Sequence, residues 1–593
     1  MKRLFLLSIL LVFNISLVSA QHLVILHTND MHSKLTGFGP ELAYTPLSVN
    51  DDKTIGGFAR LATIVKQEKE KSGDKLLVLD AGDFLMGTIF QALEPSTGFQ
   101  LNLMKKIGYD YVTLGNHEFD FGSNVLADII NSAKNNGPIP QIVASSLKFS
   151  SLSGDDKLEK LFNEGIIRPY KILEKNGVRI GIFGLLGYNA VEDIKFASPL
   201  EFEDMVKVAK KYVKILRKQE HVDLIILLSH SGFYPDGQGG YEGEDLDLAK
   251  KVKDIDIIIS GRTHVETPNY IKVGKTIIVQ TGAYVHNIGR LEFDFKDGKV
   301  NVIDYRLIHI DDKIKGDKEI NDLIEKQKDL VDRNILFSFN LQYSKPIGKT
   351  SFDINRGDHI NKKSGAMGNF VGDAIKYYTE QNVGKVDVIV TAEGVIRENI
   401  LKGEITPADV FRVMSLGFGE KDYLGYPLMR IYITGRELKQ LLELAIFSNV
   451  PGSDKYLYFA GVKVEYDPKG GFLNKVRKVV LRDGRVVDIS RKSKELYSIV
   501  TNSYIMSFIG HIKKMSYGLV KIVPKDNQGN PISDLMTTAM DFDAKTPGIQ
   551  EGKEWLALIA YINSFEDKDG DNLPDVPSIY SEFRNNFVPV ESK

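Results

Sequence analysis

The 593-residue chain contains no cysteine and carries almost no net charge. Without cysteine it cannot form disulfides, carry a lipid-modified Cys, or use a thiolate as metal ligand or nucleophile. Its 76 Lys and Arg nearly balance its 78 Asp and Glu, so no excess charge favours a nucleic acid polymer or an anionic membrane surface. Metal chemistry must therefore use His, Asp, Glu and Asn, and an anionic partner must be held by a local site.

An apolar run long enough to span a membrane comfortably is also missing. The run from Leu4 to Val18 follows Met1-Lys2-Arg3 and precedes Val18-Ser19-Ala20. A basic start, a short apolar stretch and small residues before the cut are typical of a secretory signal peptide. We therefore predict a signal peptide over 1–20, a mature chain that begins at Gln21, a periplasmic or secreted location and no membrane anchor after cleavage. A retained anchor is the alternative.

The length predicts two domains and a connector, and the chain has no internal repeat or low-complexity stretch. Up to about Ile310, apolar runs alternate with amphipathic helical stretches such as Phe58 to Lys71 and Glu201 to Lys218. Most of the runs are continuously apolar, as in strands covered on both faces, and predict an α/β layered domain over 21–310. They are His22 to His27, Lys75 to Leu79, Tyr109 to Leu114, Val178 to Leu186, Asp223 to Leu228, Ile255 to Ile259 and Lys275 to Val279.

The second half has a different pattern. Asp317 to Asn340 is charged, helical in pattern and free of Gly and Pro, which predicts a connecting helix within 311–343. The second domain, 344–593, has many polar turns. Its expected helices are Gly368 to Tyr378 and Gly435 to Ser448, and its expected strands are Val386 to Val390 and Met429 to Ile433.

Polar residues of metal-binding type follow five of the predicted strands. Because ligands in open α/β sheets bind outside the carboxyl ends of the strands, the five loops are expected to converge on one sheet edge. The loops read Asp30-Met31-His32, Gly82-Asp83, Gly115-Asn116-His117-Glu118-Phe119-Asp120, Ser229-His230-Ser231-Gly232 and Gly261-Arg262-Thr263-His264.

Carboxylate and imidazole ligands without thiolate suit Zn, Mn, Fe, Co or Ni. Asp83 is the candidate to bridge two cations, which would polarise a phosphoryl oxygen and lower the pKa of a bound water. No covalent intermediate is then needed. Four of the 11 histidines fall in these loops. We interpret the other seven as structural: His22, His27, His221, His286, His309, His359 and His511.

The DxH, GD, GNHE, SH and GxxH series resembles the calcineurin-like metallophosphoesterase superfamily, and GNHEFD at 115–120 resembles its 5'-nucleotidase branch. In the second half, Met367-Gly368-Asn369 with Asp373-Ala374 resembles the MGN/DA helix of that family, and Gly394-Val395-Ile396-Arg397 its GGxR loop. The resemblance covers nearly the whole mature chain. It implies a four-layer-type β-sandwich flanked by helices, a connecting helix and a second α/β (α+β) substrate-binding domain.

Residue by residue, the resemblance implies two divalent metal ions and a small-molecule nucleotide as substrate. His117 would stabilise charge on the transferring phosphoryl group and Asp120 would orient it, with a helix N-cap as the alternative role for Asp120. Arg397 would bind phosphate. One metal would lie among Asp30, His32, Asp83 and His264, and the other among Asp83, Asn116 and His230.

Arg262 departs from the family, whose fifth loop reads GHxH or GHxQ and uses its first His on the second metal. Arg remains protonated and cannot ligate a cation. Three alternatives stay open. The second metal is bound weakly, Arg262 points elsewhere and stabilises phosphate by charge, or the chain is a nucleotide-binding protein with an impaired metal centre.

The second half departs from the family too. The Asn that starts the GGxR loop is Ala392 here, and the expected GGDG is replaced by Ile509-Gly510-His511-Ile512. Phe418 and Tyr504 are the candidates for an aromatic pair around the nucleobase, with core packing as the alternative. Asp567-Lys568-Asp569-Gly570-Asp571, followed by Asp575, spaces carboxylates as in calcium loops but lacks the Glu of an EF-hand, so a solvated acidic turn is the alternative.

The leading hypothesis is metal-dependent hydrolysis of nucleoside 5'-monophosphates or related nucleotides. Nucleotide-sugar pyrophosphatase and cyclic-nucleotide phosphodiesterase activities on the same site are alternatives, because a fold alone does not select among them. The sequence specifies neither the metal nor an oligomeric state.

Overall fold

The computed structural model describes residues 20–590 apart from 359–360, 472 and 516–519. The predicted signal peptide therefore lies outside the described residues except for Ala20. Within the described part, no helix combines the length and apolar character that crossing a membrane requires.

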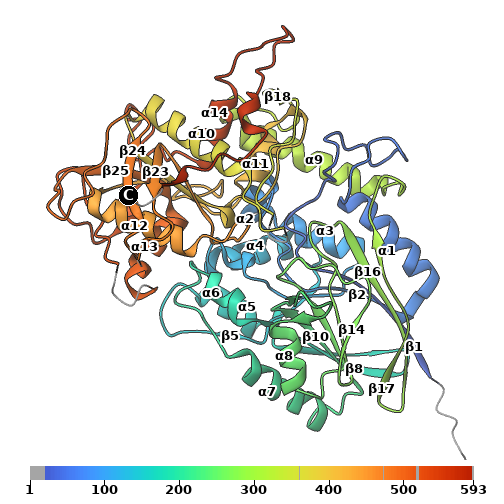
Figure 1. Cartoon of the computed structure of the whole chain (residues 1–593). Helices are drawn as coiled ribbons and strands as arrows, with labels where there is room; N and C mark the ends of the chain where they lie inside the picture. The colour runs from blue at the N-terminus through green and yellow to red at the C-terminus, as the bar shows by residue number, and fades with distance from the viewer. Residues whose placement is uncertain (1–19, 359–360, 472, 516–519, 591–593) are drawn as a thin grey trace, which may run out of the picture.

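The first half of the chain is built on two β-sheets (Figure 1). In the first sheet β1, β2, β3, β4 and β6 are parallel, and in the second β8, β10, β13 and β15 are parallel. The first sheet runs β17 (Lys299–His309), β16 (Asn287–Lys296), β1 (Gln21–Thr28), β2 (Leu76–Asp80), β3 (Tyr111–Val112), β4 (Gln141–Val143) and β6 (Ile167–Arg168). The second runs β14 (Ile271–Val273), β15 (Thr276–Val279), β13 (Ile257–Ser260), β10 (Leu224–His230), β8 (Val178–Leu186) and β7 (Tyr170–Lys175).

The central strands β2, β10 and β13 are buried on both faces, which explains why they are continuously apolar. Leu23 and Ile25 of β1 pack with Ile226 and Leu228 of β10 in a core between the sheets. The alternate residues of β1 face helices α1 (Phe58–Ser72), α3 (Phe99–Ile107) and α4 (Ser123–Asn136). Helices α7 (Met205–Lys218) and α8 (Glu244–Lys251) cover the outer face of the second sheet. The order helix, sheet, sheet, helix confirms the predicted four-layer fold.

The connecting segment is helical, as predicted. Helix α9 (Lys318–Asn334) begins after Asp317, whose carboxylate accepts a hydrogen bond from the backbone N–H of Ile320 (3.1 Å). A short 3₁₀ helix, η4 (Leu336–Phe339), follows. Ile320 and Ile324 of α9 are buried in an apolar cluster that also includes residues from Val24 to Tyr580. Residues of both halves therefore share one core.

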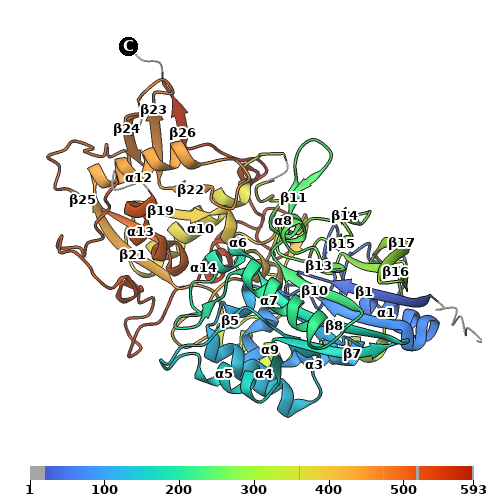
Figure 2. The ribbon, with the colours of Figure 1, turned by 90° about the horizontal axis from the view of Figure 1, so that it is seen from below.

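The second half mixes helices with smaller sheets (Figure 2). Its main sheet runs β21 (Leu428–Thr434), β25 (Leu496–Asn502), β19 (Val388–Ala392) and β22 (Leu457–Ala460). A second sheet runs β24 (Val476–Leu481), β23 (Val462–Tyr466) and β26 (Phe587–Pro589), and β18 (Gly348–Thr350) pairs with β20 (Gly403–Ile405). The helices are α10 (Ala366–Asn382), α11 (Pro407–Val413), α12 (Gly435–Ser448), α13 (Ser503–Met515) and α14 (Glu554–Ile562).

Two predicted elements differ from the structure. The helix predicted from Glu201 begins at Met205 instead, because residues 201–202 pair as β9 with β5 (Leu147–Lys148) and Asp204 caps α7 by accepting the Lys207 N–H (2.8 Å). The strand predicted over Tyr109 to Leu114 is only two residues long. Beyond it, the Thr113 N–H still donates to the Asp80 carbonyl oxygen (3.1 Å), and the Thr113 hydroxyl donates to the Val143 carbonyl oxygen (2.8 Å).

His27 on β1 is completely buried. Neither of its ring nitrogens has a hydrogen-bond partner in the described structure. Its ring stacks on Tyr305 (centroids 6.0 Å apart) and lies against Gly289, where an added Cβ would be 2.0 Å from Nε2. Burial lowers the pKa of His27 to about 3, because a protonated imidazole loses its hydration there.

We therefore expect His27 to make the fold acid-sensitive. The pKa is lower in the folded chain than in the unfolded chain, so only the unfolded chain binds this proton between about pH 6.5 and pH 3. The free energy of unfolding then falls with decreasing pH, by at most about 1.4 kcal/mol per pH unit. Thermal unfolding of His27→Leu at pH 7.5 and pH 5 should show the variant gaining on the wild type by about 2 kcal/mol at the lower pH. A difference independent of pH would contradict this.

Candidate metal centre

The five predicted ligand loops meet where the carboxyl ends of strands from both sheets come together. Loops after β1, β2 and β3 come from the first sheet, and loops after β10 and β13 from the second. The sequence predicts that the five loops meet at one edge of a single sheet, whereas in the structure they meet at an edge that two stacked sheets share. Backbone hydrogen bonds from Asp30 N to Gly82 O and from His32 N to Asp83 O, both 2.9 Å, join the first two loops.

Asp30, His32 and His264 form one group of ligand atoms that all lie within 4.8 Å of one another. Asp30 Oδ1 lies 3.5 Å from His264 Nε2 and 4.0 Å from His32 Nε2, and the two Nε2 atoms are 3.2 Å apart. Asp30 and His32 are buried, whereas the His264 side chain is 30% exposed. The group is thus open to solvent on the His264 side.

Asp83, His230 and Asp30 form a second group. His230 Nε2 lies 3.0 Å from Asp83 Oδ2 and 3.2 Å from Asn116 Oδ1. Asp83 also belongs to a third group, with His32 and His117. Its carboxylate therefore lies between the imidazoles of the two predicted metal positions.

Hydrogen bonds on the far side of two imidazoles fix which nitrogen faces the cluster. His32 Nδ1 lies 3.0 Å from the Met86 carbonyl oxygen, and His230 Nδ1 lies 2.8 Å from that of Ala81. A carbonyl oxygen only accepts, so each Nδ1 carries a proton and each Nε2 is directed at the cluster. Nε2 of His230 therefore faces carboxylate and amide oxygens, and it either offers them a proton or, on deprotonation, offers a lone pair to a shared cation. A divalent cation satisfies such a set, and its lack of thiolate fits Zn, Mn, Fe, Co or Ni.

The charges in the cluster also favour a bound cation. Burial by itself would lower the pKa of His230, but the carboxylates of Asp83 and Asp30 raise it to about 9. Burial would raise the pKa of Asp83, but His230 and His117 hold it well below its ordinary value. The buried carboxylates therefore attract positive charge, and the residues present fit a cation.

The backbone of the ligand loops is unusual. Asp30, His32, Asp83 and His264 all have positive φ, at 50°, 48°, 55° and 56°. Non-glycine residues adopt such angles rarely and at a cost in energy, mostly at functional sites. The loops also approach one another closely, since a Cβ on Gly115 would lie 2.2 Å from Asp83 Oδ1. The geometry of the cluster therefore restricts which residues can occupy these positions.

His117 lies beside the cluster on the 3₁₀ helix η3 (His117–Phe119). Its Nδ1 is 2.6 Å from Asp120 Oδ2, and its backbone N–H donates to Asp83 Oδ1 (2.9 Å). The carboxylate fixes the ring so that Nε2 is free to act on a substrate. The alternative role of Asp120 as a helix cap is wrong, because α4 begins at Ser123 and Gly122 occupies its N-cap position.

Glu118 is a residue of the site that we did not assign from the sequence. Its carboxylate accepts hydrogen bonds from the backbone N–H groups of Asp83 (2.9 Å), Leu85 (2.9 Å) and Gly115 (2.6 Å). One buried side chain thus holds the loops after β2 and β3 together. The sequence signal that could have identified Glu118 is its place inside the GNHE motif.

The side chain of Arg262 forms an ion pair with a residue outside the ligand groups. Its backbone N–H donates to Asp30 Oδ2 (2.9 Å), whereas its guanidinium forms an ion pair with Asp193 at the end of α6 (Tyr188–Asp193). Burial alone would lower the pKa of Arg262, but nearby carboxylates raise it. Asp193 contributes more to this effect than Asp83 or Asp30. A positive charge therefore lies beside the second predicted metal position.

Arg397 in the second half faces the cluster. It follows the short 3₁₀ helix η5 (Glu393–Val395), and its positive charge acts on the pKa values of His32 and Tyr284. Its carbonyl oxygen accepts from Arg356 (3.3 Å) and its backbone N–H donates to the Val413 carbonyl oxygen (2.8 Å), which fix its position. In the described part of the chain its guanidinium has no hydrogen-bond or ion-pair partner.

The two predicted base-stacking residues lie in one aromatic group but do not contact each other directly. Phe418 packs edge-to-face on Phe196 (5.1 Å) and Phe121 (6.1 Å) of the first half. Tyr504 stacks on Tyr426 (5.5 Å, 23°), which contacts Phe196 (6.3 Å). Asp120, Arg262 and Arg397 are among the charges that act on the pKa of Tyr504, so Tyr504 lies near the metal cluster.

Two other motifs make structural contacts. In α10, Asn369 bonds the backbone of Arg584, and Asp373 forms ion pairs with Arg482 (2.9 Å) and Arg584 (2.7 Å). In the acidic turn, Lys349 Nζ lies 2.6 Å from Asp571 and also pairs with Asp569, so a lysine already offsets the charge of these exposed carboxylates.

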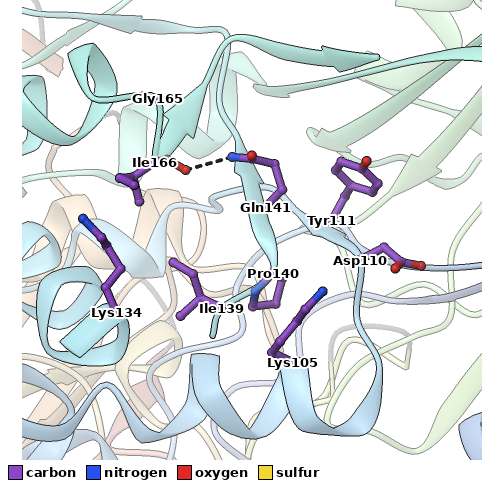
Figure 3. A pocket seen from close by; sticks show the side chains of 9 residues that line it. All are labelled: Lys105, Asp110, Tyr111, Lys134, Ile139, Pro140, Gln141, Gly165 and Ile166. Atoms are coloured by element: carbon purple, nitrogen blue, oxygen red, sulfur yellow. Dashed lines mark hydrogen bonds between the residues drawn. The ribbon is translucent and has the colours of Figure 1, made fainter. Parts of the chain in front are cut away.

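A pocket on the first half lies away from the cluster (Figure 3). It is lined by residues at the amino ends of the strands, such as Tyr111 on β3 and Gln141 on β4, whose side chain donates to the Ile166 carbonyl oxygen (2.8 Å). The ligand loops after β1, β2 and β3 follow the carboxyl ends of strands in the same sheet. None of the predicted site residues lines this pocket.

Comparisons with known proteins agree with both halves of the chain. The family model for calcineurin-like phosphoesterase matches residues 23–266, and that for the 5'-nucleotidase C-terminal domain matches 346–517. The trifunctional nucleotide phosphoesterase protein YfkN of Bacillus subtilis is 26% identical over 82% of this chain, which spans only 32% of that relative. The 5'-nucleotidase of Vibrio cholerae is 27% identical over 74% of this chain and 78% of its own length.

Two solved structures share the fold. The 5'-nucleotidase precursor from Thermus thermophilus superposes with a TM-score of 0.67 at 20% identity, over 96% of this chain and 100% of its own. The sulfate thiohydrolase SoxB of the same organism superposes with a TM-score of 0.63 at 19% identity, over 96% of this chain and 97% of its own.

Proposed function

Because the chain belongs to the 5'-nucleotidase family of calcineurin-like phosphoesterases, we propose that it hydrolyses nucleoside 5'-monophosphates or related nucleotides to nucleoside and phosphate. Members of this family are phosphoric ester hydrolases that use divalent metals. The observation that carries the proposal is the buried Asp and His cluster with His117 and Asp120 beside it. Retention of this pair and membership of a hydrolase family argue against a non-catalytic nucleotide-binding protein.

We propose that two divalent metal ions bind in the cluster, held by the predicted ligands. The first lies among Asp30, His32, Asp83 and His264, and the second among Asp83, Asn116 and His230. Bound metals would offset negative charge on the phosphoryl oxygens and activate a water for attack. The carbonyl partners of His32 and His230 keep each Nε2 directed at the cluster, where it would serve as a metal ligand.

The other groups act on the substrate. His117, held by Asp120, donates a hydrogen bond from Nε2 to a phosphoryl oxygen and stabilises the charge that develops there. Arg397 belongs to the opposite half, and its guanidinium has no ion-pair partner among the described residues, which suits a bidentate phosphate contact. Phe418 and Tyr504 belong to the aromatic group beside this position and offer flat surfaces for a nucleobase.

A second activity on the same site is favoured by one observation. The residues expected to recognise base and ribose depart from the family pattern at Ala392 and at Ile509 to Ile512. The relative YfkN is named a trifunctional nucleotide phosphoesterase. Nucleotide-sugar pyrophosphatase or cyclic-nucleotide phosphodiesterase activity is therefore the alternative, and a substrate panel decides it.

The panel contains nucleoside 5'-monophosphates, a cyclic nucleotide, a nucleotide sugar and an aryl phosphate, each with Zn, Mn or Co added. We expect the highest kcat/KM on a 5'-monophosphate. Higher kcat/KM on the cyclic nucleotide or the nucleotide sugar would favour the alternative, and no hydrolysis of any nucleotide would overturn the proposal.

We further propose action in the periplasm or outside the cell, from the sequence pattern of residues 1–20. N-terminal sequencing of exported protein should then find Gln21.

Arg262 should weaken the second metal. It replaces an imidazole ligand, and its charge repels a cation at Asp83, Asn116 and His230. We expect the isolated protein to bind one metal tightly and a second only at raised concentration. Arg262→His should strengthen the second binding step about tenfold or more.

Calorimetric metal titration measures both steps, and Asp193→Asn is the matched control. That variant frees the guanidinium of Arg262 without supplying an imidazole, so it should not strengthen the second step. Two equally tight sites in the unmodified protein, unchanged by Arg262→His, would contradict this expectation.

A further inference from the structure

An ion pair joins the two halves of the chain close to the metal cluster. Lys34 Nζ of the first half donates to Glu398 Oε2 of the second half at 2.9 Å. The Lys34 side chain is 5% exposed and that of Glu398 is 18% exposed. The two residues are 364 positions apart in the sequence, so only the folded arrangement brings them together.

The surroundings of this pair leave each charge with few other partners. Lys34 Nζ lies 4.9 Å from the centroid of the Tyr284 ring and 5.9 Å from that of Phe38. Arg412 of the second half lies 3.9 Å from the same Phe38 centroid and forms its own ion pair with Asp409. A buried charge is costly without its partner, so the pair of Lys34 and Glu398 favours one arrangement of the two halves.

Both members of the pair are next to residues of the site. Lys34 comes two residues after the predicted metal ligand His32, and Glu398 comes directly after Arg397. Each is therefore linked to a site residue by only one or two peptide units, which leaves little room for independent movement. Tyr284, which the Lys34 ammonium contacts, has its ring 5.5 Å from that of His32 and 5.2 Å from that of His264.

We propose that Lys34 and Glu398 are positioning residues that hold the phosphate-binding Arg397 at a fixed place over the metal cluster. The contacts of Arg397 with Arg356 and Val413 fix its loop only within the second half. The pair of Lys34 and Glu398 fixes that loop relative to the first half. Neither residue touches substrate in this account, and the inference rests on the proposed function, because it assigns Arg397 to substrate phosphate.

The position of Arg397 should affect substrate binding more than the chemical step. Lys34→Met and Glu398→Gln each remove one charge of the pair and keep a side chain of similar length. We expect each to raise KM for a nucleoside 5'-monophosphate about tenfold and to weaken binding of inorganic phosphate to a similar extent, with kcat within about threefold of the wild type. Metal content should not change, because neither residue is a ligand.

Lys34→Arg keeps the charge and should retain most of the wild-type KM. The exchanged pair Lys34→Glu with Glu398→Lys should recover part of the loss of either single exchange. The matched control is Lys106→Met, which breaks an exposed ion pair with Glu319 (2.6 Å) and should leave KM unchanged. Thermal unfolding identifies any variant that fails to fold. If Lys34→Met or Glu398→Gln does not fold, Lys34→Arg is compared with the wild type instead.

Unchanged KM and phosphate affinity in folded Lys34→Met and Glu398→Gln would overturn the inference. Loss of metal from these variants would also overturn it, since the pair would then support the metal loops rather than Arg397. A wild-type protein that does not hydrolyse any nucleotide would instead overturn the proposed function. Calorimetry with inorganic phosphate would still test the pair in that case.

Discussion

Asp83→Ala should abolish phosphate release and remove bound metal. Its carboxylate lies 3.0 Å from His230 Nε2 and shares a group of ligand atoms with His32 and His117. In the proposed centre Asp83 is the ligand common to both metal positions, so its removal should weaken the binding of both cations. We expect kcat/KM to fall by roughly 10⁴-fold or more, and metal content measured by atomic absorption to fall well below that of the wild type.

The matched control for Asp83→Ala is Asp52→Asn. Asp52 is also a buried carboxylate, but it pairs with Arg60 (2.8 Å) and belongs to none of the ligand groups. This variant should unfold at a lower temperature and keep its metal. Wild-type turnover and metal content in Asp83→Ala would mean that the active site lies elsewhere in the protein.

His117→Ala should reduce kcat without removing metal. The Nε2 of His117 is directed by the 2.6 Å contact between Nδ1 and Asp120, and a general acid or charge stabiliser held in this way contributes roughly 10²–10⁴-fold to rate. We expect a loss of that size in kcat with KM nearly unchanged, because the interaction is made mainly in the transition state.

Asp120→Asn is the graded control for His117. It keeps the shape of the side chain but orients the imidazole less strongly, so kcat should fall by less than in His117→Ala. Metal content should match the wild type in both variants. If His117→Ala lost metal to the same degree as Asp83→Ala, His117 would be a ligand rather than a group acting on substrate.

Local features of the sequence predicted most of the elements. Val178–Leu186 is apolar except for the exposed Arg179 because both faces of β8 are covered, and the predicted strand has the observed bounds. Helix α12, Gly435–Ser448, also has the predicted bounds. Thr434 and Glu437 form a capping box at its start, in which the Glu437 side chain accepts the Thr434 N–H (2.8 Å).

The sequence also predicted which loops carry the polar cluster, because strand ends and ligand-type residues are both local. It did not show that the loops come from two sheets, since stacking of sheets depends on packing between distant segments. It did not show that Arg262 pairs with Asp193, 69 residues away, or that Lys34 pairs with Glu398. Such pairs depend on where folded segments meet.

The aromatic pair illustrates the same limit of local patterns. The sequence makes Phe418 and Tyr504 candidates for an aromatic pair around the nucleobase. In the structure Phe418 is packed by Phe121 and Phe196, whereas Tyr504 stacks on Tyr426. The partners of each ring come from other parts of the chain, which no local pattern specifies.

The most direct test of the account is metal-dependent hydrolysis by the purified protein. The protein is stripped of metal with a chelator, and Mn is then titrated back while bound metal per chain and phosphate release from a nucleoside 5'-monophosphate are measured together. The account predicts that phosphate release falls to background in the stripped protein, returns as metal binds and stays absent in Asp83→Ala. Undiminished phosphate release by the metal-free protein would contradict it.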